Sequence, residues 1–129
     1  MRHPVRPVSA GLTIASARCH QGCVLKKTEQ CECKAGLHPT ALRFVASRAV
    51  AALGSDGNTD TAPSTTEGVD FPIHALAIAA MGLHLFDYLQ FEDLTLACEH
   101  AGRWKFLFVA APLRILGGTG SLIDPLAVL

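Results

Sequence analysis

The hydrophobic and polar positions of this chain follow a helical period in some stretches and form short apolar runs in others. Within residues 39–48 the apolar residues Leu42, Val45 and Ala46 recur at intervals of three and four, which predicts a helix with one apolar face. The run 49–53 that follows is continuously apolar and stops at a glycine, which is typical of a short buried strand. The first unit of structure is therefore predicted to be a helix followed by a strand.

The middle of the chain predicts another helix, a strand and a second helix. Residues 72–81 have a helical pattern that ends at Gly82, and residues 83–89 alternate loosely, as in a strand or a strand-like exit. A helix from Glu92 to about His100 follows, with acidic residues in its first turn, where they suit the positive end of the helix dipole.

The carboxyl-terminal part predicts two strands, and a long polar loop lies earlier in the chain. The apolar run within residues 105–112 is the pattern of a central strand that is covered on both faces, and residues 125–129 form a last short strand. Residues 54–68 are nearly all turn formers and small polar residues, which predicts a surface loop. Asp56 and Asp60 in this loop are possible ligands, although acids in such loops mostly cap turns.

Composition indicates the class of protein and excludes some kinds of binding partner. The chain has 129 residues, half of them apolar, which is enough for one domain with a real core. Its net charge is zero, so there is no electrostatic case for nucleic acid or for an anionic membrane. Polar residues interrupt the longest apolar stretch and the amino terminus lacks an apolar signal region, so we expect no membrane span and a cytoplasmic location.

The net charge of zero is the sum of two segments that have opposite net charges. Residues 1–34 hold six Lys/Arg and two Glu, net +4, whereas residues 35–129 hold five basic and nine acidic side chains, net −4. The first 18 residues have the acid-free composition of a mitochondrial presequence, but Pro4 and Pro7 oppose its helix. We therefore expect a poorly ordered, basic, cysteine-containing segment before the domain at 35–129.

A cluster of thiols lies in the basic segment. Cys19, His20, Cys23, Cys31 and Cys33 provide ligand types that zinc prefers, and such a site would make the segment a zinc-stabilised interaction element. Their spacing differs from paired C-x2-C turns, which favours unpaired thiols over a zinc site. A disulfide is the third alternative for a cytoplasmic chain.

His74 and Asp87 are the candidate metal ligands. They are thirteen positions apart, on two predicted elements whose ends can bring them to one point. Imidazole and carboxylate are suitable ligands for zinc or manganese, and such an ion can make water nucleophilic enough to hydrolyse an amide. The alternative is structural: His74 satisfied by the backbone at a helix start, and Asp87 capping the end of a strand.

Several segments in one order resemble the carboxyl-terminal part of the cyclase family of metal-dependent amide hydrolases, to which the bacterial kynurenine formamidases belong. The resemblance covers about residues 35–129. It is carried by G36-L-H-P39, L53-G-S-D56, P72-I-H74, G82-x4-D87, L94-x2-A-C-E-H-A-G102, F106-L-F-V-A-A-P-L113 and G118-T-G-S121.

The resemblance implies a fold and a set of site residues. The fold is α/β, the second half of the family's swivelling β/β/α domain, with helices packed on a small mixed sheet. His74 corresponds to a metal-binding histidine, and Asp87 falls where the family more often has Glu. Asp56 lies in a loop that helps form the family's active-site wall, and Gly118 and Thr119 are candidate substrate-binding residues.

The resemblance also implies a reaction. It indicates a zinc- or manganese-dependent hydrolase of a small amide such as an aryl-formamide. The model substrate is N-formylkynurenine, from the kynurenine pathway of tryptophan catabolism. The family's upstream block H-x-G-T-H-x-D, which supplies most metal ligands, is absent, so we expect the isolated chain to be inactive and assign no catalytic residue. The alternative is a truncated, non-catalytic remnant that acts as a binding or pairing module. Uncovered sheet edges and apolar faces then predict a homo-oligomer.

Overall fold

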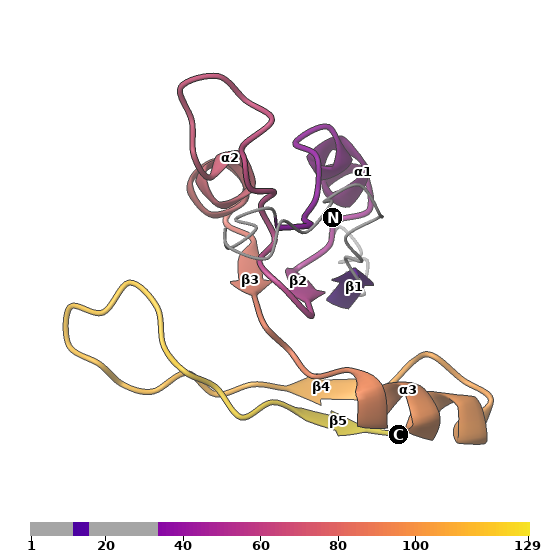
Figure 1. The fold of residues 1–129 in the computed structure, drawn as a ribbon. Helices are drawn as coiled ribbons and strands as arrows, with labels where there is room; N and C mark the ends of the chain where they lie inside the picture. The colour runs from indigo at the N-terminus through magenta and orange to yellow at the C-terminus, as the bar shows by residue number, and fades with distance from the viewer. Residues whose placement is uncertain (1–11, 16–33) are drawn as a thin grey trace, which may run out of the picture. The chain divides into compact units, whose positions relative to one another are not determined.

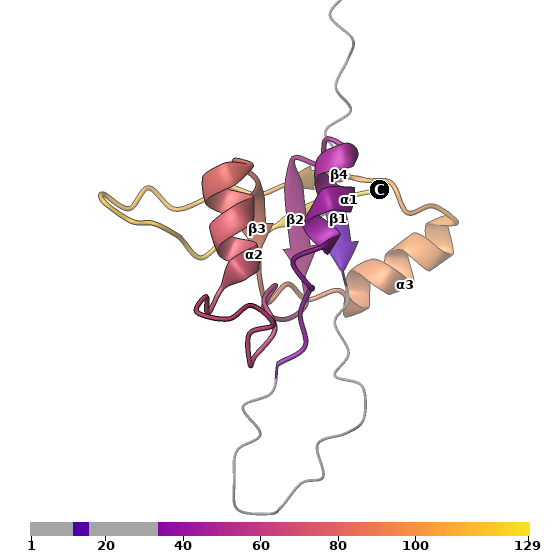
Figure 2. The ribbon, with the colours of Figure 1, turned by 90° about the horizontal axis from the view of Figure 1, so that it is seen from above.

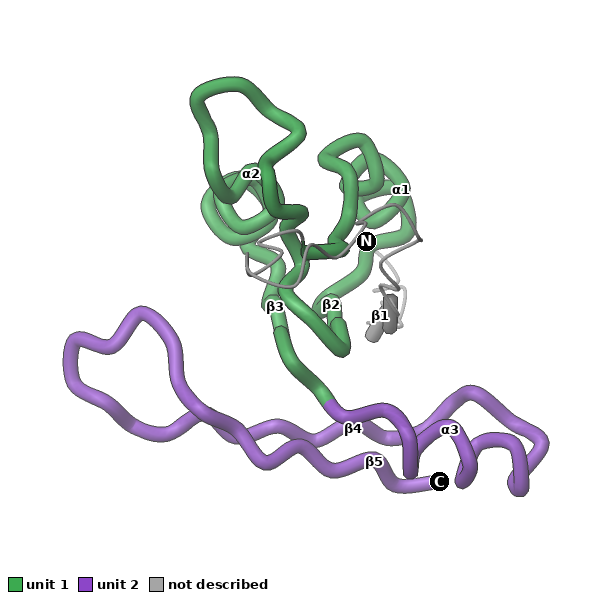
Figure 3. Tube along the Cα trace, in the orientation of Figure 1, with its two compact units in different colours: residues 1–89 green, residues 90–129 purple. Residues whose placement is uncertain are grey.

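In the computed structural model of the chain, the described residues are 12–15, as backbone, and 34–129. They divide into two units, one within residues 1–89 and one formed by residues 90–129 (Figure 3). The cysteines of the amino-terminal cluster, Cys19, Cys23, Cys31 and Cys33, lie outside the described residues, as does His20. No helix within the described part of the chain is long and apolar enough to cross a membrane.

The first unit is built on a parallel sheet of three strands. Its order is β1 (Leu12–Ala15), β2 (Ala52–Ser55) and β3 (His84–Phe86), with β2 in the centre. Strand β2 begins three residues later than the predicted run 49–53. Strand β1 comes from the basic segment that was expected to be poorly ordered, and pairs with β2 over four residues.

Two helical segments lie on the same face of this sheet (Figures 1 and 2). Helix α1 spans Ala41–Ser47, inside the predicted 39–48. Helix α2 (Pro72–His74) begins with proline at its first position, where the missing N–H costs no hydrogen bond, and continues as the π-helix η1 (Ala75–Ala80). The predicted helix 72–81 is therefore present, although most of it has π-helical rather than α-helical hydrogen bonding.

The core lies between these helices and the sheet. The register pairs Leu53 of β2 with Leu85 of β3, so both side chains are on one face, where Leu53 is 1% exposed and Leu85 packs against the core. The buried members of this core are Leu42, Val45, Leu53, Ile73, Ala77 and Leu83.

The second unit contains helix α3 (Glu92–Ala101) and an antiparallel pair of strands, β4 (Leu107–Val109) and β5 (Leu126–Val128). Helix α3 begins at Glu92 as predicted and ends at Gly102, whose φ of 61° is a left-handed conformation that glycine adopts without strain. The α/β class is confirmed, with the strands in two small sheets.

One prediction in this unit is wrong. The apolar run at 105–112 was expected to be a central strand covered on both faces, but β4 belongs to a two-stranded sheet, and its Leu107 is 64% exposed. A run of apolar residues indicates that a strand is buried, but it does not identify the segments that cover the strand. Those segments depend on which parts of the chain pair with the strand.

The loop after β2 also differs from its expected exposure. Thr59 and Asp60 are 1% and 2% exposed, so the middle of the loop is buried. Residues 34–37 fix it: the N–H of Lys34 donates to Ala62 O at 2.8 Å, and the N–H of Leu37 donates to Thr59 O at 2.8 Å. Backbone hydrogen bonds to this neighbouring segment make burial of a polar loop possible.

Gly36 lies where this contact is tightest. A Cβ at position 36 would lie 2.3 Å from the carbonyl carbon of Asp60, a distance at which backbone must move. We therefore predict that Gly36→Ala lowers the free energy of unfolding by about 1–3 kcal/mol, the usual cost of overpacking. Chemical denaturation measures this, with Gly57→Ala as the matched control because nothing lies within 4 Å of its Cβ. Equal effects of the two substitutions would contradict the prediction.

Candidate functional site

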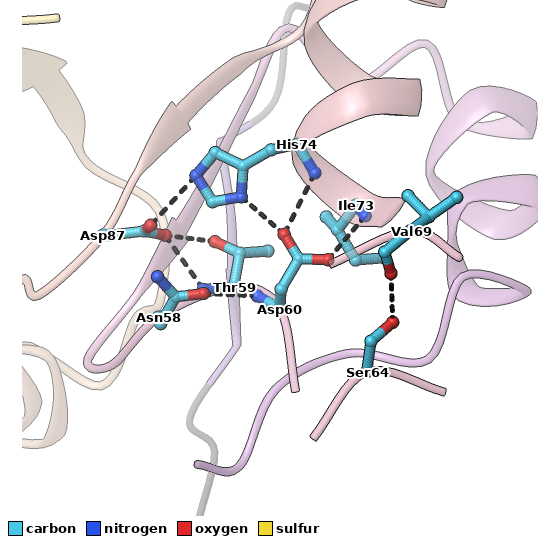
Figure 4. A network of polar contacts seen from close by, with 8 residues as sticks. All are labelled: Asn58, Thr59, Asp60, Ser64, Val69, Ile73, His74 and Asp87. Carbon is cyan, nitrogen blue, oxygen red and sulfur yellow. Dashed lines mark hydrogen bonds and ion pairs between the residues drawn. The ribbon is translucent and has the colours of Figure 1, made fainter. Parts of the chain in front are cut away.

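The polar site lies at the carboxyl edge of the parallel sheet. Asp87 follows the last residue of β3, and the buried loop residues Thr59 and Asp60 follow β2. His74 comes from the first turn of α2. Carboxyl ends of parallel strands meet at one edge, so residues far apart in the chain converge there. Figure 4 shows the imidazole of His74 between the carboxylates of Asp60 and Asp87.

Asp60 contacts both the ring and the backbone of His74. Its Oδ2 lies 2.5 Å from His74 Nδ1 and accepts the His74 N–H at 3.1 Å. Its Oδ1 accepts the N–H of Ile73 at 2.6 Å. The Asp60 side chain is 1% exposed, and a buried carboxylate needs partners in place of water. The three neighbouring nitrogen atoms stabilise it.

Through the same contacts Asp60 caps helix α2. The N–H groups of a first helical turn have no partner within the helix, and Phe71, which precedes α2, provides no side-chain hydrogen bond to them. A carboxylate from the preceding loop accepts two of these N–H groups instead and places negative charge at the positive end of the helix. The loop and the helix start are therefore joined at His74.

Asp87 contacts the other ring nitrogen. Its Oδ2 lies 3.2 Å from His74 Nε2, while its Oδ1 accepts the Thr59 N–H at 3.0 Å and also the Thr59 hydroxyl. The chain just after Asp87 is fixed too, since the N–H of Tyr88 donates to Gly57 O at 3.0 Å and that of Leu89 to Ser55 O at 2.8 Å. Asp87 is thus held against the loop that also supplies Asp60.

The geometry suits a cation bound by His74 and Asp87. Two donors on one ion at about 2.1 Å are about 3.0 Å apart in octahedral and about 3.4 Å apart in tetrahedral coordination, and the 3.2 Å between Nε2 and Oδ2 falls between these values. With a neutral imidazole, the two carboxylates leave the site negatively charged. The side chains of His74 and Asp87 are 31% and 16% exposed, so solvent reaches them. A direct ion pair between an imidazolium and Asp87 fits the same distance.

The described residues supply only part of such a site. Within residues 34–129 no group of three or more His, Cys, Asp or Glu is placed to hold one metal ion. Nε2 of His74 and Oδ2 of Asp87 therefore fit as two ligands, and further ligands would have to be added to them. The structure brings these two residues together, and their role as metal ligands stays a prediction.

The candidate substrate-binding residues lie elsewhere in the chain. Asp56 is exposed, directly after β2. Gly118 and Thr119 are exposed in the connection between β4 and β5, within the second unit. Their assignment to a substrate remains a prediction.

The sequence analysis undervalued Asp60 and missed Thr59. Asp60 was considered as a possible ligand or a cap of a local turn, and it caps a helix that begins 12 residues later in the chain. No local pattern links position 60 to position 74, so its acidity within an otherwise small and polar loop was the available signal. No signal in the sequence identifies Thr59, because its partner Asp87 is 28 residues away.

Comparison with known proteins yields a fold. No protein-family profile matches the chain, and neither does any curated protein. Among solved structures, the chain is similar to one described as a novel cyclase, with a TM-score of 0.66 and 23% identity over 75% of this chain. The chain spans 31% of the length of that protein, about a third. The cyclase-like fold expected from the sequence is therefore confirmed.

The Thr59 hydroxyl gives a direct test of how Asp87 is held. Thr59→Val keeps the side-chain shape but removes the hydroxyl that donates to Asp87, so we predict a loss of about 1–2 kcal/mol in the free energy of unfolding. Denaturant titration measures it, with the exposed Thr65→Val as control. If both variants are as stable as the parent chain, the hydroxyl does not stabilise Asp87.

Proposed function

We propose that this chain carries part of the active site of a metal-dependent hydrolase of the cyclase type. The substrate is a small amide such as an aryl-formamide, with N-formylkynurenine as the model compound. One observation carries the proposal: an imidazole nitrogen and a carboxylate oxygen lie 3.2 Å apart at the carboxyl edge of a sheet with a cyclase-like fold. Ligands in α/β proteins commonly bind at such an edge.

His74 Nε2 and Asp87 Oδ2 would hold the ion, which we propose to be zinc or manganese. When bound, a divalent cation supplies Lewis acidity that polarises an amide carbonyl and makes water a better nucleophile. Catalytic zinc sites use three protein ligands, so two are insufficient alone and the isolated chain is expected to be inactive. Asp87 holds its place through Thr59, which keeps its second oxygen turned toward the imidazole.

The remaining assignments follow from the family resemblance and are part of the proposal. Asp56, Gly118 and Thr119 would contact the amide substrate. No nucleic acid or membrane partner is proposed, because the chain has no net charge. The chain spans only about a third of the cyclase to which it is similar, so the activity of a whole enzyme would require further structure.

We predict that the full chain binds Mn²⁺ weakly, through His74 and Asp87, because two protein ligands leave most of the coordination to water. Manganese is the suitable probe because it prefers oxygen ligands such as the Asp87 carboxylate to thiolates, whereas zinc would also bind the thiols of Cys19 to Cys33. Asp87→Asn should weaken Mn²⁺ binding by at least about tenfold, since losing a ligand should cost no less than losing a residue that merely orients one. The loss of the electron paramagnetic resonance signal of free Mn²⁺ on titration measures the affinity.

The exposed Asp70 provides the matched control for this titration. Asp70→Asn removes the same charge from the chain, so it should leave Mn²⁺ affinity within about twofold of the parent value, because exposed charges are well screened. An Mn²⁺ affinity that is unchanged in Asp87→Asn would rule out Asp87 as a ligand. Hydrolysis of N-formylkynurenine should be absent from the isolated chain, and metal-dependent hydrolysis would show that the chain is a complete enzyme.

A second candidate function is a non-catalytic pairing module. In the sheet of β4 and β5, the register pairs Leu107 with Val128 and Val109 with Leu126, so these four side chains share one face, and they are 44–64% exposed. A two-stranded sheet is marginally stable unless its apolar face is covered. We propose a second copy of this chain as the cover, because a two-fold dimer apposes identical patches and an uncharged apolar patch is complementary to itself.

This candidate predicts a dimer in solution. Leu107→Thr combined with Val128→Thr keeps β-forming residues but makes the face polar, so the dimer should dissociate at least about tenfold more readily. Sedimentation equilibrium measures the dissociation constant. The control is Leu122→Thr, which changes an 83% exposed leucine outside the strands. A parent chain that is monomeric at all concentrations, or an equal effect of the control, would refute pairing through this face.

A further inference from the structure

We infer that Asp60 is a positioning residue for His74: it fixes which ring nitrogen carries the hydrogen and which way the ring faces, so that Nε2 presents its lone pair toward Asp87. The inference deepens the proposed function and rests on it in one respect, namely that Nε2 is the atom offered to a cation. The assignment of the hydrogen and of the ring orientation depends only on the contacts within this chain.

The two carboxylates contact the ring unequally. The distance from Nδ1 to Asp60 Oδ2 is 2.5 Å, whereas the distance from Nε2 to Asp87 Oδ2 is 3.2 Å. A carboxylate only accepts hydrogen bonds, and a neutral imidazole has one N–H and one lone pair. The shorter contact, to the more buried carboxylate, therefore places the hydrogen of the neutral ring on Nδ1 and leaves the lone pair on Nε2.

The same contact fixes the orientation of the ring. Turning the imidazole by half a turn about its Cβ–Cγ bond would place a carbon atom against Asp60 in place of Nδ1. A carboxylate that is 1% exposed would then lose one of its three nitrogen partners with no water to replace it. Such a loss costs free energy, so the ring remains with Nε2 toward Asp87.

Asp60 is itself held independently of His74. The N–H of Asp60 donates to Asn58 Oδ1 at 2.9 Å, and its backbone carbonyl lies against Gly36. Its Oδ1 is engaged by the Ile73 N–H. An outer carboxylate that orients a histidine has to be in place before a cation arrives, and the Ile73 N–H, which contacts the carboxylate itself, provides that preorganisation.

The substitution Asp60→Asn separates positioning from simple capping. Two backbone N–H groups and the His74 Nδ1 contact the two oxygens of Asp60, whereas an amide has one oxygen and an NH2 group that donates. When the NH2 group lies beside the ring, it meets the lone pair of Nδ1 and moves the ring hydrogen to Nε2. When it lies beside Ile73, it faces another donor. We therefore expect the ring hydrogen in this variant to shift at least partly to Nε2.

The experiment is ¹⁵N NMR of the imidazole in the metal-free full chain, in alkaline solution where histidine is neutral. The parent chain should show His74 with its hydrogen on Nδ1, and Asp60→Asn should show increased Nε2–H. In parallel, Mn²⁺ affinity should fall by about 10–100-fold in Asp60→Asn, the usual effect of losing an outer carboxylate.

The matched control is Asn58→Ala. It removes the hydrogen bond that Asn58 accepts from the Asp60 N–H and so weakens the same loop, but it keeps the carboxylate. It should reduce stability while leaving the His74 hydrogen on Nδ1 and Mn²⁺ affinity within about twofold of the parent value. If Asp60 had only a structural role, both variants would change the NMR signal and the affinity together with stability.

Each outcome bears on the inference. A parent chain with the His74 hydrogen on Nε2 overturns it, and this measurement needs no variant to fold. Unchanged hydrogen position and unchanged affinity in Asp60→Asn also overturn it. Hydrogen on Nδ1 in a parent chain that does not bind Mn²⁺ supports the positioning of His74 and refutes the proposed metal site, so the two failures are distinguishable.

Discussion

The buried carboxylate of Asp60 is the constraint on which the first unit depends. It is 1% exposed, and among the residues that the structure describes it is stabilised by two backbone N–H groups and one imidazole nitrogen rather than by a lysine or arginine. Burial strengthens these contacts and makes each of them costly to lose. The loop after β2, the start of α2 and the imidazole of His74 therefore hold one another in place, although they are separate in the chain.

This constraint explains why a loop of small polar residues packs inside the protein. The backbone of Thr59 and Ala62 in this loop is hydrogen-bonded to residues 34–37, which lie close enough to Asp60 that only glycine fits at position 36 without moving backbone. The buried loop then supplies Thr59 to Asp87 and Asp60 to His74. A rigid backbone beneath the polar side chains is what a preorganised ligand site requires. The same backbone supports a closed structural ion-pair network of these side chains equally well.

The two units differ in how their apolar residues are used. In the first unit, side chains from α1, β2 and α2 form a core in which Leu53 and Ile73 are almost fully buried. In the second, the strands β4 and β5 expose one apolar face. A sheet of two strands has too little area to bury its own side chains, so its stability depends on what is packed against that face.

The sequence by itself determined most of the elements and two of the site residues. Periodicity predicted α1, α3 and the helix at 72–81, because helix formation depends on near neighbours, and a family resemblance selected His74 and Asp87. Only the tertiary structure decided that Asp60 joins them, that its loop is buried and that β4 lies in a two-stranded sheet. The physical reason is that a hydrogen bond across 14 residues, or a contact with Gly36 from another segment, leaves no periodic trace in the chain. Such contacts exist only after the parallel strands have brought their carboxyl ends to one edge.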